Sequence, residues 1–309
     1  MSQDKHLPRI SVITPSLNQG RYLRQCIDSV LSQDYQNLEF IIIDGGSTDE
    51  SVPIIKEYEG KIGYWVSKPD KGQSDAINKG FRRASGELVA WLNADDYYLP
   101  GAFDRVIDAY RADLLAPFYF GDGLRVDETG AVISNFFPTG TLTFDRQALV
   151  MGLNYILQPA TFINRCALEQ AGYLDAGLRY GMDSDLWMRL SRIGNPRAIA
   201  AVLAATREYA ATKTASGSFA RVDELRKIAM KHSGLPITPG VLCYFLDTFY
   251  RFAQQHENVF PESYLTDELL FWKKTAELFG RFNAGPDGFP LEPKERQQLH
   301  QNNDEQALS

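Results

Sequence analysis

The chain has 309 residues, of which 44% are apolar and 23% charged, an ordinary composition for a soluble globular protein. Its net charge of −7 argues against a nucleic-acid surface, which would usually show an excess of basic residues. The cysteines, Cys26, Cys166 and Cys243, lie far apart and predict neither a disulfide framework nor a zinc site. No apolar signal segment or membrane-length apolar run occurs, so we expect a cytoplasmic protein, at most peripheral to the inner face of a membrane.

The first elements alternate between buried strands and helices. Residues 10–14 are typical of a strand, which Pro15 should end, and a helix is predicted from about 21 to 33 because its apolar positions fall on one face. Residues 38–43 predict a second buried strand that ends at Asp44. This order is a βαβ unit and predicts an α/β fold with a mostly parallel sheet flanked by helices.

Asp44 is a candidate site residue because it stands at the carboxyl end of a strand, where open α/β sheets bind ligands. Gly45 and Gly46 would let a ligand approach the backbone closely. The alternative is a turn residue that satisfies local amides. No Gly-x-Gly-x-x-Gly follows a strand and no P-loop motif occurs, which excludes those two modes of nucleotide binding.

Two adjacent carboxylates end a later strand. Residues 88–92 form an unbroken apolar stretch, typical of a strand buried on both faces, and Asp95 and Asp96 follow it. Like charges side by side are costly in a dry interior, so we expect them at the carboxyl end of the strand, where a divalent cation would neutralise them. The alternative is a turn followed by a helix N-cap.

Asp183 is a further candidate, since apolar residues recur at helical spacing after it and place it at a helix entrance. One interpretation is an N-cap, where the helix dipole would stabilise the anion and weaken it as a base. The other is a general base, with Tyr180, Met182 and Trp187 desolvating the carboxylate.

Three segments, taken together, resemble the motifs of family 2 glycosyltransferases. They are Thr14-Pro15-Ser16-Leu17-Asn18, Asp44-Gly45-Gly46-Ser47-Thr48-Asp49 and Asn93-Ala94-Asp95-Asp96. They stand in the order and spacing of the family, and the resemblance covers roughly Ile10 to Thr214. It implies a GT-A fold with a Rossmann-like, mostly parallel sheet, and an inverting transferase that uses a nucleotide-sugar donor, UDP-linked.

The resemblance also implies which residues bind the donor. Nucleotide-sugar contacts are assigned to Thr14, Pro15, Asn18, Asp44, Lys71, Asp75, Asn93, Ala94, Asp95, Arg207, Lys213 and Thr214. Asp44 would accept a hydrogen bond from uracil, and the last three would belong to a segment that closes over the diphosphate. Asn93 replaces the first Asp of the Asp-X-Asp signature but can still bond a ribose hydroxyl.

The metal role therefore falls on Asp95, which would hold Mn or Mg, with Asp96 as its partner. Tyr209 stands where the family often has a His, so phosphate oxygens and water would complete the coordination. Asp183 matches the catalytic base of the Glu-Asp-x-Asp-Leu-Trp motif, although Met182 replaces the usual acidic neighbour.

We predict a catalytic domain over residues 1–216, a helical region over 217–285 and a disordered tail over 286–309. A stripe of apolar side chains at helical spacing lies in the second part, at Val241, Phe245, Phe249 and Phe252. Because this helix lacks a strongly basic face, packing onto the catalytic domain or onto a second copy, in a homodimer, is favoured over a membrane contact.

The principal hypothesis is sugar transfer from a UDP-sugar to a hydroxyl of a glycan or lipid-linked glycan, in bacterial-type polysaccharide or glycoconjugate synthesis. A nucleotidyltransferase and a non-catalytic sugar-nucleotide binding protein remain as alternatives. A serine hydrolase is disfavoured because no Gly-x-Ser-x-Gly occurs. A processive synthase is disfavoured because Gln-x-x-Arg-Trp and membrane helices are absent.

Overall fold

The structure, a computed structural model, describes residues 7–137, 142–209, 212 and 217–255. The chain divides into two compact units, Met1–Leu242 and Cys243–Ser309. The predicted tail over 286–309 lies outside the described residues, as does the part of the predicted helical region from 256 to 285. No helix in the described ranges has both the length and the apolar character that crossing a bilayer requires.

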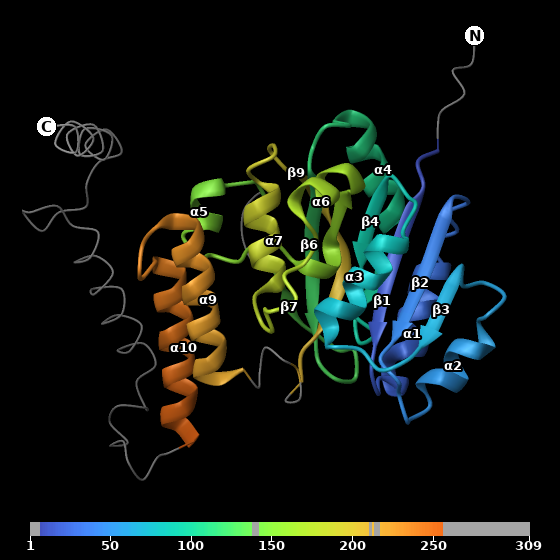
Figure 1. The fold of residues 1–309 in the computed structure, drawn as a ribbon, viewed down its shortest axis with the longest axis horizontal. Helices are drawn as coiled ribbons and strands as arrows, with labels where there is room; N and C mark the ends of the chain where they lie inside the picture. Colours follow the sequence, from blue (N-terminus) through green and yellow to red (C-terminus); the bar gives the residue numbers. More distant parts are fainter. Residues whose placement is uncertain (1–6, 138–141, 210–211, 213–216, 256–309) are drawn as a thin grey trace, which may run out of the picture. The chain divides into compact units, whose positions relative to one another are not determined.

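The N-terminal half alternates strands with helices, as predicted (Figure 1). Its elements are β1 (Ile10–Ser16), α1 (Gly20–Leu31), β2 (Leu38–Asp44), α2 (Ser51–Glu57), β3 (Tyr64–Ser67), α3 (Gln73–Arg83) and β4 (Leu88–Trp91). β1 pairs in parallel with both β2 and β4, and β2 pairs in parallel with β3. The carboxyl ends of these strands therefore meet at one edge of the sheet.

Pro15 does not end the first strand, contrary to the prediction, and β1 continues to Ser16. Its pairing with β4 stops at Ile13, whereas its pairing with β2 continues to the last residue. The missing N–H of Pro15 therefore costs no bond to β4, and proline is tolerated where a strand has lost one neighbour.

The second half of the chain extends the same sheet. Its elements are β5 (Tyr97–Tyr98), α4 (Ala102–Ala112), β6 (Phe118–Val126), β7 (Val132–Asn135), α5 (Arg146–Val150), the 3₁₀ helix η1 (Gln158–Ala160), β8 (Thr161–Asn164), α6 (Arg165–Ala171), α7 (Met182–Leu190), β9 (Arg197–Arg207), α9 (Ser218–Ser233) and α10 (Pro239–Gln255). The strand order is β3-β2-β1-β4-β8-β6-β9-β5, with β7 paired antiparallel to β6. Since β8 runs antiparallel to β4 and β6, the sheet is mixed but mostly parallel in its first half.

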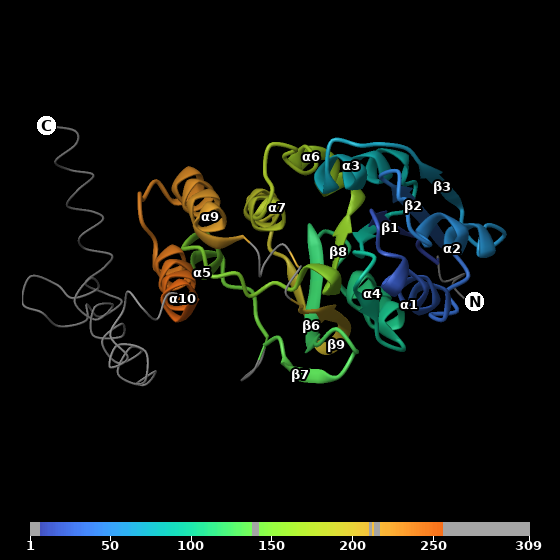
Figure 2. The ribbon, with the colours of Figure 1, turned by 90° about the horizontal axis from the view of Figure 1, so that it is seen from below.

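Alternation along the central strands divides the core into two layers. Val12 and Phe40 pack with α1 and α4 on one face of the sheet, and Ile13 and Ile41 pack with α3 and α7 on the other. Figure 2 shows these helices on opposite sides of the strands. The carboxyl edge of the sheet is thus bordered by helices from both layers.

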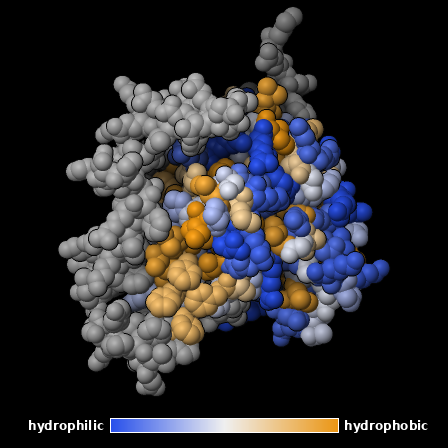
Figure 3. Space-filling model, turned by 60° about the vertical axis from the view of Figure 1, so that its left-hand side comes forward, coloured by the Kyte–Doolittle hydropathy of each residue, from blue (hydrophilic) through white to orange (hydrophobic). Residues whose placement is uncertain are grey.

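The first compact unit extends beyond the predicted boundary after residue 216, because α9 packs against α5 and α7. Helix α9 is therefore part of the fold that carries Asp183. α10 matches the predicted helix over 241–254, and its Phe245 and Phe249 rings stack with centroids 6.3 Å apart. Figure 3 shows apolar side chains gathered on the face that it brings forward.

Candidate active site

Two of the motif segments pack against each other beyond β1 and β2. The Asn18 N–H donates to Ser47 Oγ at 2.8 Å, and Asn18 Oδ1 accepts from the Thr48 N–H at 2.8 Å. The Gly45 N–H donates to the Ser16 carbonyl at 2.8 Å. Asn18 has a φ of 53°, a conformation that asparagine adopts more readily than most residues. These bonds join the two segments into one loop platform at the sheet edge.

Asp44 is fully buried and stabilises this platform from within. Its Oδ1 accepts from the backbone N–H groups of Gly46 at 3.0 Å and Ser47 at 2.9 Å, and from Ser67 Oγ at 2.6 Å. The turn role considered as the alternative is therefore present in the structure. A contact of Asp44 with a nucleobase stays a prediction.

The turn over residues 68–72 lies against the same platform. The Lys68 N–H donates to the Asp44 carbonyl at 2.9 Å. A Cβ on Gly45 would lie 2.8 Å from Asp70 Oδ2, so a larger residue there would have to displace the Asp70 side chain. Lys71 is exposed beside this turn, where its side chain is accessible to a ligand.

Asp75 is committed to local partners in the first turn of α3. Its Oδ2 accepts from the Lys71 N–H at 3.0 Å and lies 2.8 Å from Lys79 Nζ. The bond to Lys79 lowers the pKa of Asp75, with the Lys71 N–H acting in the same direction. Asp75 therefore shapes the turn that presents Lys71.

The adjacent aspartates after β4 occupy different environments. Asp95 is partly exposed, whereas Asp96 is buried. Burial, together with the neighbouring Asp95, raises the pKa of Asp96 to about 8, and burial raises the pKa of Asp95 also. Asp95 is thus the carboxylate open to a ligand, and Asp96 supports it from inside.

Arg207, at the end of β9, holds this pair of aspartates in place. Its backbone N–H donates to Asp96 Oδ1 at 3.0 Å, and its Nε donates to the Asp95 carbonyl at 3.0 Å. The buried guanidinium also donates to Gln25 and to two carbonyls of the β6–β7 turn, and it lies over the Tyr22 ring. These contacts favour a role in positioning the aspartates over direct contact with a donor.

Tyr209 lies beside the exposed aspartate. Its hydroxyl donates to Asp95 Oδ2 at 2.9 Å, and its ring centroid is 5.4 Å from that of Tyr22. Burial, together with the negative charge of Asp95, raises the pKa of this hydroxyl. Tyr209 therefore orients Asp95, in the position where the resemblance places a His. Lys213 and Thr214 lie outside the described residues.

The described residues contain no group of three or more His, Cys, Asp or Glu side chains suited to a metal ion. Of the two adjacent aspartates, Asp95 is the one that offers a partly exposed hard oxygen ligand of the kind that Mn and Mg prefer. The carboxylate pair fits a cation that takes its remaining ligands from diphosphate oxygens and water.

Asn93 connects three elements through its side-chain amide. Its Nδ2 donates to Asp96 Oδ2 at 3.1 Å and to Gln158 Oε1 at 3.0 Å, and its Oδ1 accepts from Gln73 Nε2 at 2.7 Å. An aspartate here would place a third carboxylate against Asp96 and could not donate to it. The departure from Asp-X-Asp therefore fits the buried state of Asp96.

The first turn of α3 brings the second half of the site to the same edge. While Gln73 bonds Asn93, the Ser74 hydroxyl lies 2.8 Å from Met182 Sδ and 3.3 Å from the Leu178 carbonyl. Met182 is the first residue of α7. Neighbouring residues of one helix turn thus connect the Asp95 loop with the helix that carries Asp183.

Asp183 is not the N-cap of α7, which is Gly181. It lies within the first helical turn, and its Oδ1 accepts from the Ser184 N–H at 2.7 Å. Burial raises the pKa of Asp183, against the opposing effects of Ser184 and Arg221. A carboxylate with a raised pKa is a better proton acceptor, as a general base requires.

Glu224 of α9 holds the loop that leads into α7. Its carboxylate accepts from the backbone N–H groups of Arg179 at 2.9 Å, Tyr180 at 2.6 Å and Gly181 at 2.8 Å. The sequence analysis missed Glu224, because no local pattern relates it to a loop more than forty residues earlier. Helix α9 therefore fixes the entrance of α7 and, with it, Asp183.

Asp185, two residues after Asp183, anchors α9 to α7. It is fully buried and lies 2.7 Å from Arg189 Nε, 2.9 Å from Lys231 Nζ and 2.9 Å from His232 Nε2. Despite its burial, these partners hold the pKa of Asp185 well below its usual range. A carboxylate so stabilised as an anion is a poor base, which leaves Asp183 as the candidate in this helix.

The family of the chain follows from sequence comparisons. Residues 11–148 match the family described as Glycosyl transferase family 2. The chain is 30% identical over 225 residues to an uncharacterized glycosyltransferase of Rickettsia prowazekii, covering 69% of this chain and 68% of the relative. A relative in Rickettsia typhi is 30% identical over 206 residues, 63% of this chain and 62% of that one. The chain belongs to glycosyltransferase family 2.

Solved structures show the same fold. The chain matches Staphylococcus aureus TarS, residues 1–349 in complex with UDP-GlcNAc, with a TM-score of 0.60, 16% identity and coverage of 80% of this chain and 73% of that one. The mannosyltransferase PcManGT of Pyrobaculum calidifontis, in complex with GDP-Man and Mn²⁺, gives 0.57 with 16% identity, covering 89% and 81%. The predicted GT-A fold is thereby confirmed.

Proposed function

We propose that the chain is an inverting glycosyltransferase that transfers a sugar from a UDP-sugar to a hydroxyl group of a glycan or lipid-linked glycan. The observation that carries this proposal is that α3 connects the loop of Asp95 with the helix of Asp183, through Gln73 and Ser74. Asp95, as the ligand of a cation bound to the diphosphate, and Asp183, as a base of raised pKa, are thereby held at one edge of the sheet.

The donor would lie on the loop platform. Asp44, Asn18 and the exposed Lys71 surround the part of the edge next to Asp95. The TarS complex with UDP-GlcNAc supports a UDP-linked donor, although the GDP-Man complex of PcManGT shows that another base occurs on this fold. We assign Thr14 and Pro15, both buried in β1, to the floor of this platform.

Asp95 would hold a divalent cation, with the buried Asp96 as its supporting partner, as PcManGT binds Mn²⁺ on the same fold. When bound, Mn or Mg supplies positive charge that stabilises the departing diphosphate. The chain's own contribution is orientation, because Tyr209 and Arg207 fix the carboxylate and the carbonyl of Asp95.

Asp183 would remove the proton from the acceptor hydroxyl. The hydroxyl oxygen forms a bond to the anomeric carbon as the bond from that carbon to the diphosphate oxygen breaks, and the proton passes to the Asp183 carboxylate. Direct displacement from the opposite side inverts the configuration, so no covalent intermediate is needed. A chondroitin synthase of Escherichia coli, 26% identical over 62% of this chain and 27% of its own length, supports a role in polysaccharide or glycoconjugate synthesis.

Product analysis with a panel of UDP-sugars and hydroxyl acceptors, with and without Mn²⁺, tests this proposal. Sugar transfer from the UDP-sugar releases UDP. A nucleotidyltransferase would instead release pyrophosphate from UTP and a sugar 1-phosphate, which are supplied in a parallel reaction, and a binding protein releases neither product. We expect UDP and an inverted glycosidic bond. Release of pyrophosphate, or tight UDP-sugar binding without turnover across the panel, would contradict the proposal.

A further inference from the structure

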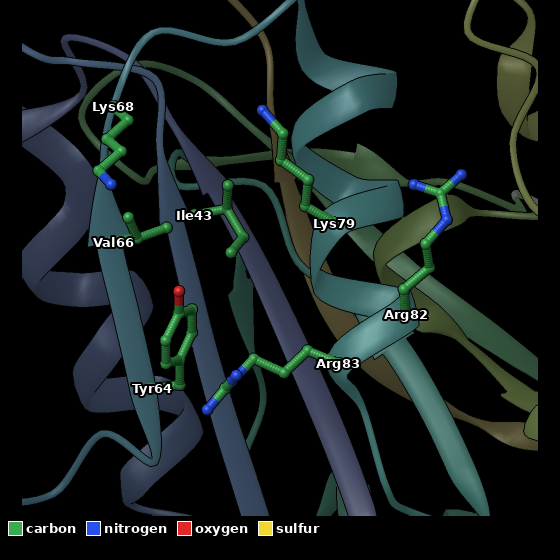
Figure 4. Close-up of a pocket in the computed structure, with 7 residues that line it drawn as sticks. All are labelled: Ile43, Tyr64, Val66, Lys68, Lys79, Arg82 and Arg83. Carbon is green, nitrogen blue, oxygen red and sulfur yellow. The ribbon is translucent and has the colours of Figure 1, made fainter.

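A basic cleft lies between the edge strand β3 and helix α3 (Figure 4). It has a volume of about 490 Å³ and is lined by Ile43, Tyr64, Val66, Lys68, Lys79, Arg82 and Arg83. Successive side chains of a strand point to opposite faces, so Ile43 faces the α3 layer and the next residue, Asp44, does not. The cleft therefore opens on the α3 face of the sheet, next to the turn over residues 68–72 that borders the platform of Asp44.

Positive charge in this cleft exceeds the negative charge near it. Lys79 is paired with Asp75 at 2.8 Å. Within the described parts of the chain, no carboxylate lies within ion-pair distance of Lys68, Arg82 or Arg83, although the whole protein carries a net charge of −7. A cluster of positively charged side chains on an acidic protein attracts anions to that part of its surface.

The cleft also offers a preorganised guanidinium and an apolar floor. Arg83 extends from α3 toward β3, and its guanidinium carbon lies 3.6 Å from the centroid of the Tyr64 ring (Figure 4). Stacking on a ring fixes a guanidinium while its N–H edge remains able to donate to an anion. Ile43 and Val66 provide apolar surface beside it.

We propose that this cleft binds a phosphate-bearing saccharide. The phosphate pairs with the guanidinium fork of Arg83, which matches phosphate oxygens, and Lys68 at the other end of the cleft adds positive charge (Figure 4). The sugar ring packs on the apolar floor beside Tyr64. The site goes beyond the proposed transfer reaction, because it uses neither Asp95 nor Asp183 and lies on the α3 face of the sheet.

The test uses α-D-glucose 1-phosphate as the probe, added to the full chain and followed by calorimetry and hydrogen–deuterium exchange. We expect exchange protection over residues 64–67 and 79–83. In the double variant K68Q/R83Q the dissociation constant should rise by about tenfold or more, because the charge-assisted contact of Arg83 and the positive charge of Lys68 are lost. The matched control is K56Q/R105Q, which removes two exposed cations from α2 and α4 and gives the same net charge.

Equal affinity in K68Q/R83Q and in the control would overturn the proposal, and the cations would then only cover the edge of the sheet. Protection confined to residues 93–96 would overturn it too, since the probe would then occupy the donor site. A parallel assay uses phosphatidylcholine vesicles with and without phosphatidylglycerol. If the vesicles with phosphatidylglycerol bind, the double variant weakens that binding and the probe does not bind, the cleft recognises a membrane surface instead.

Discussion

Replacing Glu224 with alanine would remove the carboxylate that holds the entrance of α7. Three backbone N–H groups, those of Arg179, Tyr180 and Gly181, would lose their acceptor. A hydrogen bond to a charged group contributes about 1.5–3 kcal/mol when buried, and less here because Glu224 is only partly buried, so we expect a loss of about 2–4 kcal/mol in unfolding free energy.

The kinetic consequence should be specific to the acceptor step. Asp183 lies two residues after the loop that Glu224 holds, so a displaced loop misplaces the base. We expect kcat to fall by about tenfold, since catalytic groups tolerate little misplacement, while UDP affinity changes little. The Glu224→Gln variant, which keeps one carbonyl acceptor for Tyr180 and Gly181, should recover part of both losses.

Asp223 provides a matched control, because it is the preceding residue on α9 and is exposed. It lies 2.9 Å from Arg226 and 2.7 Å from Lys227, both on its own helix. Urea unfolding, nucleotide calorimetry and a transfer assay should be run on Glu224→Ala and Asp223→Ala together. If the two variants have the same stability and the same kcat, the positioning role of Glu224 is refuted.

Three further perturbations test separate parts of the site. Asp95→Ala should abolish metal-dependent turnover while the circular dichroism spectrum is retained, and full activity of the folded variant would contradict the metal assignment. UDP should bind more tightly than CDP, because a carboxylate accepts from the uracil ring N–H and unprotonated cytosine has none there; calorimetry showing equal affinities would remove the role of Asp44. Asp185 has a lowered pKa, so its stabilising contribution is present above the unfolded aspartate value of 3.8 and is lost as the pH falls below it. Asp185→Asn should therefore flatten the loss of stability on acidification, and an unchanged acid limb in thermal unfolding would contradict the anchor role.

The first half of the fold could be predicted because its signals are local. The apolar runs before Asp44 and Asp95 specify buried strands, and both residues lie near the carboxyl ends of those strands. Pro15 was misjudged because the consequence of its missing N–H depends on which neighbour strand is still paired, and that is a property of the sheet.

The supporting groups of the site could not be predicted, since they come from distant parts of the chain. Asn93 could be identified as a departure from the family pattern, but not its bonds to Gln73 and Gln158. The sequence shows that Arg207 carries a positive charge, which suggests a contact with the diphosphate. It does not show that the side chain is buried and donates to the Asp95 carbonyl. Glu224 gave no signal within its own helix.

The most direct test of the account is Asp183→Asn, assayed both for sugar transfer and for UDP binding. The substitution keeps the shape of the side chain and removes its capacity to accept a proton. Transfer should fall by roughly a hundredfold or more while UDP affinity changes little, because a base acts on the acceptor in the transition state. Asp108→Asn, on the exposed face of α4, serves as the matched control. Undiminished transfer by Asp183→Asn would contradict the central claim that this carboxylate is the catalytic base.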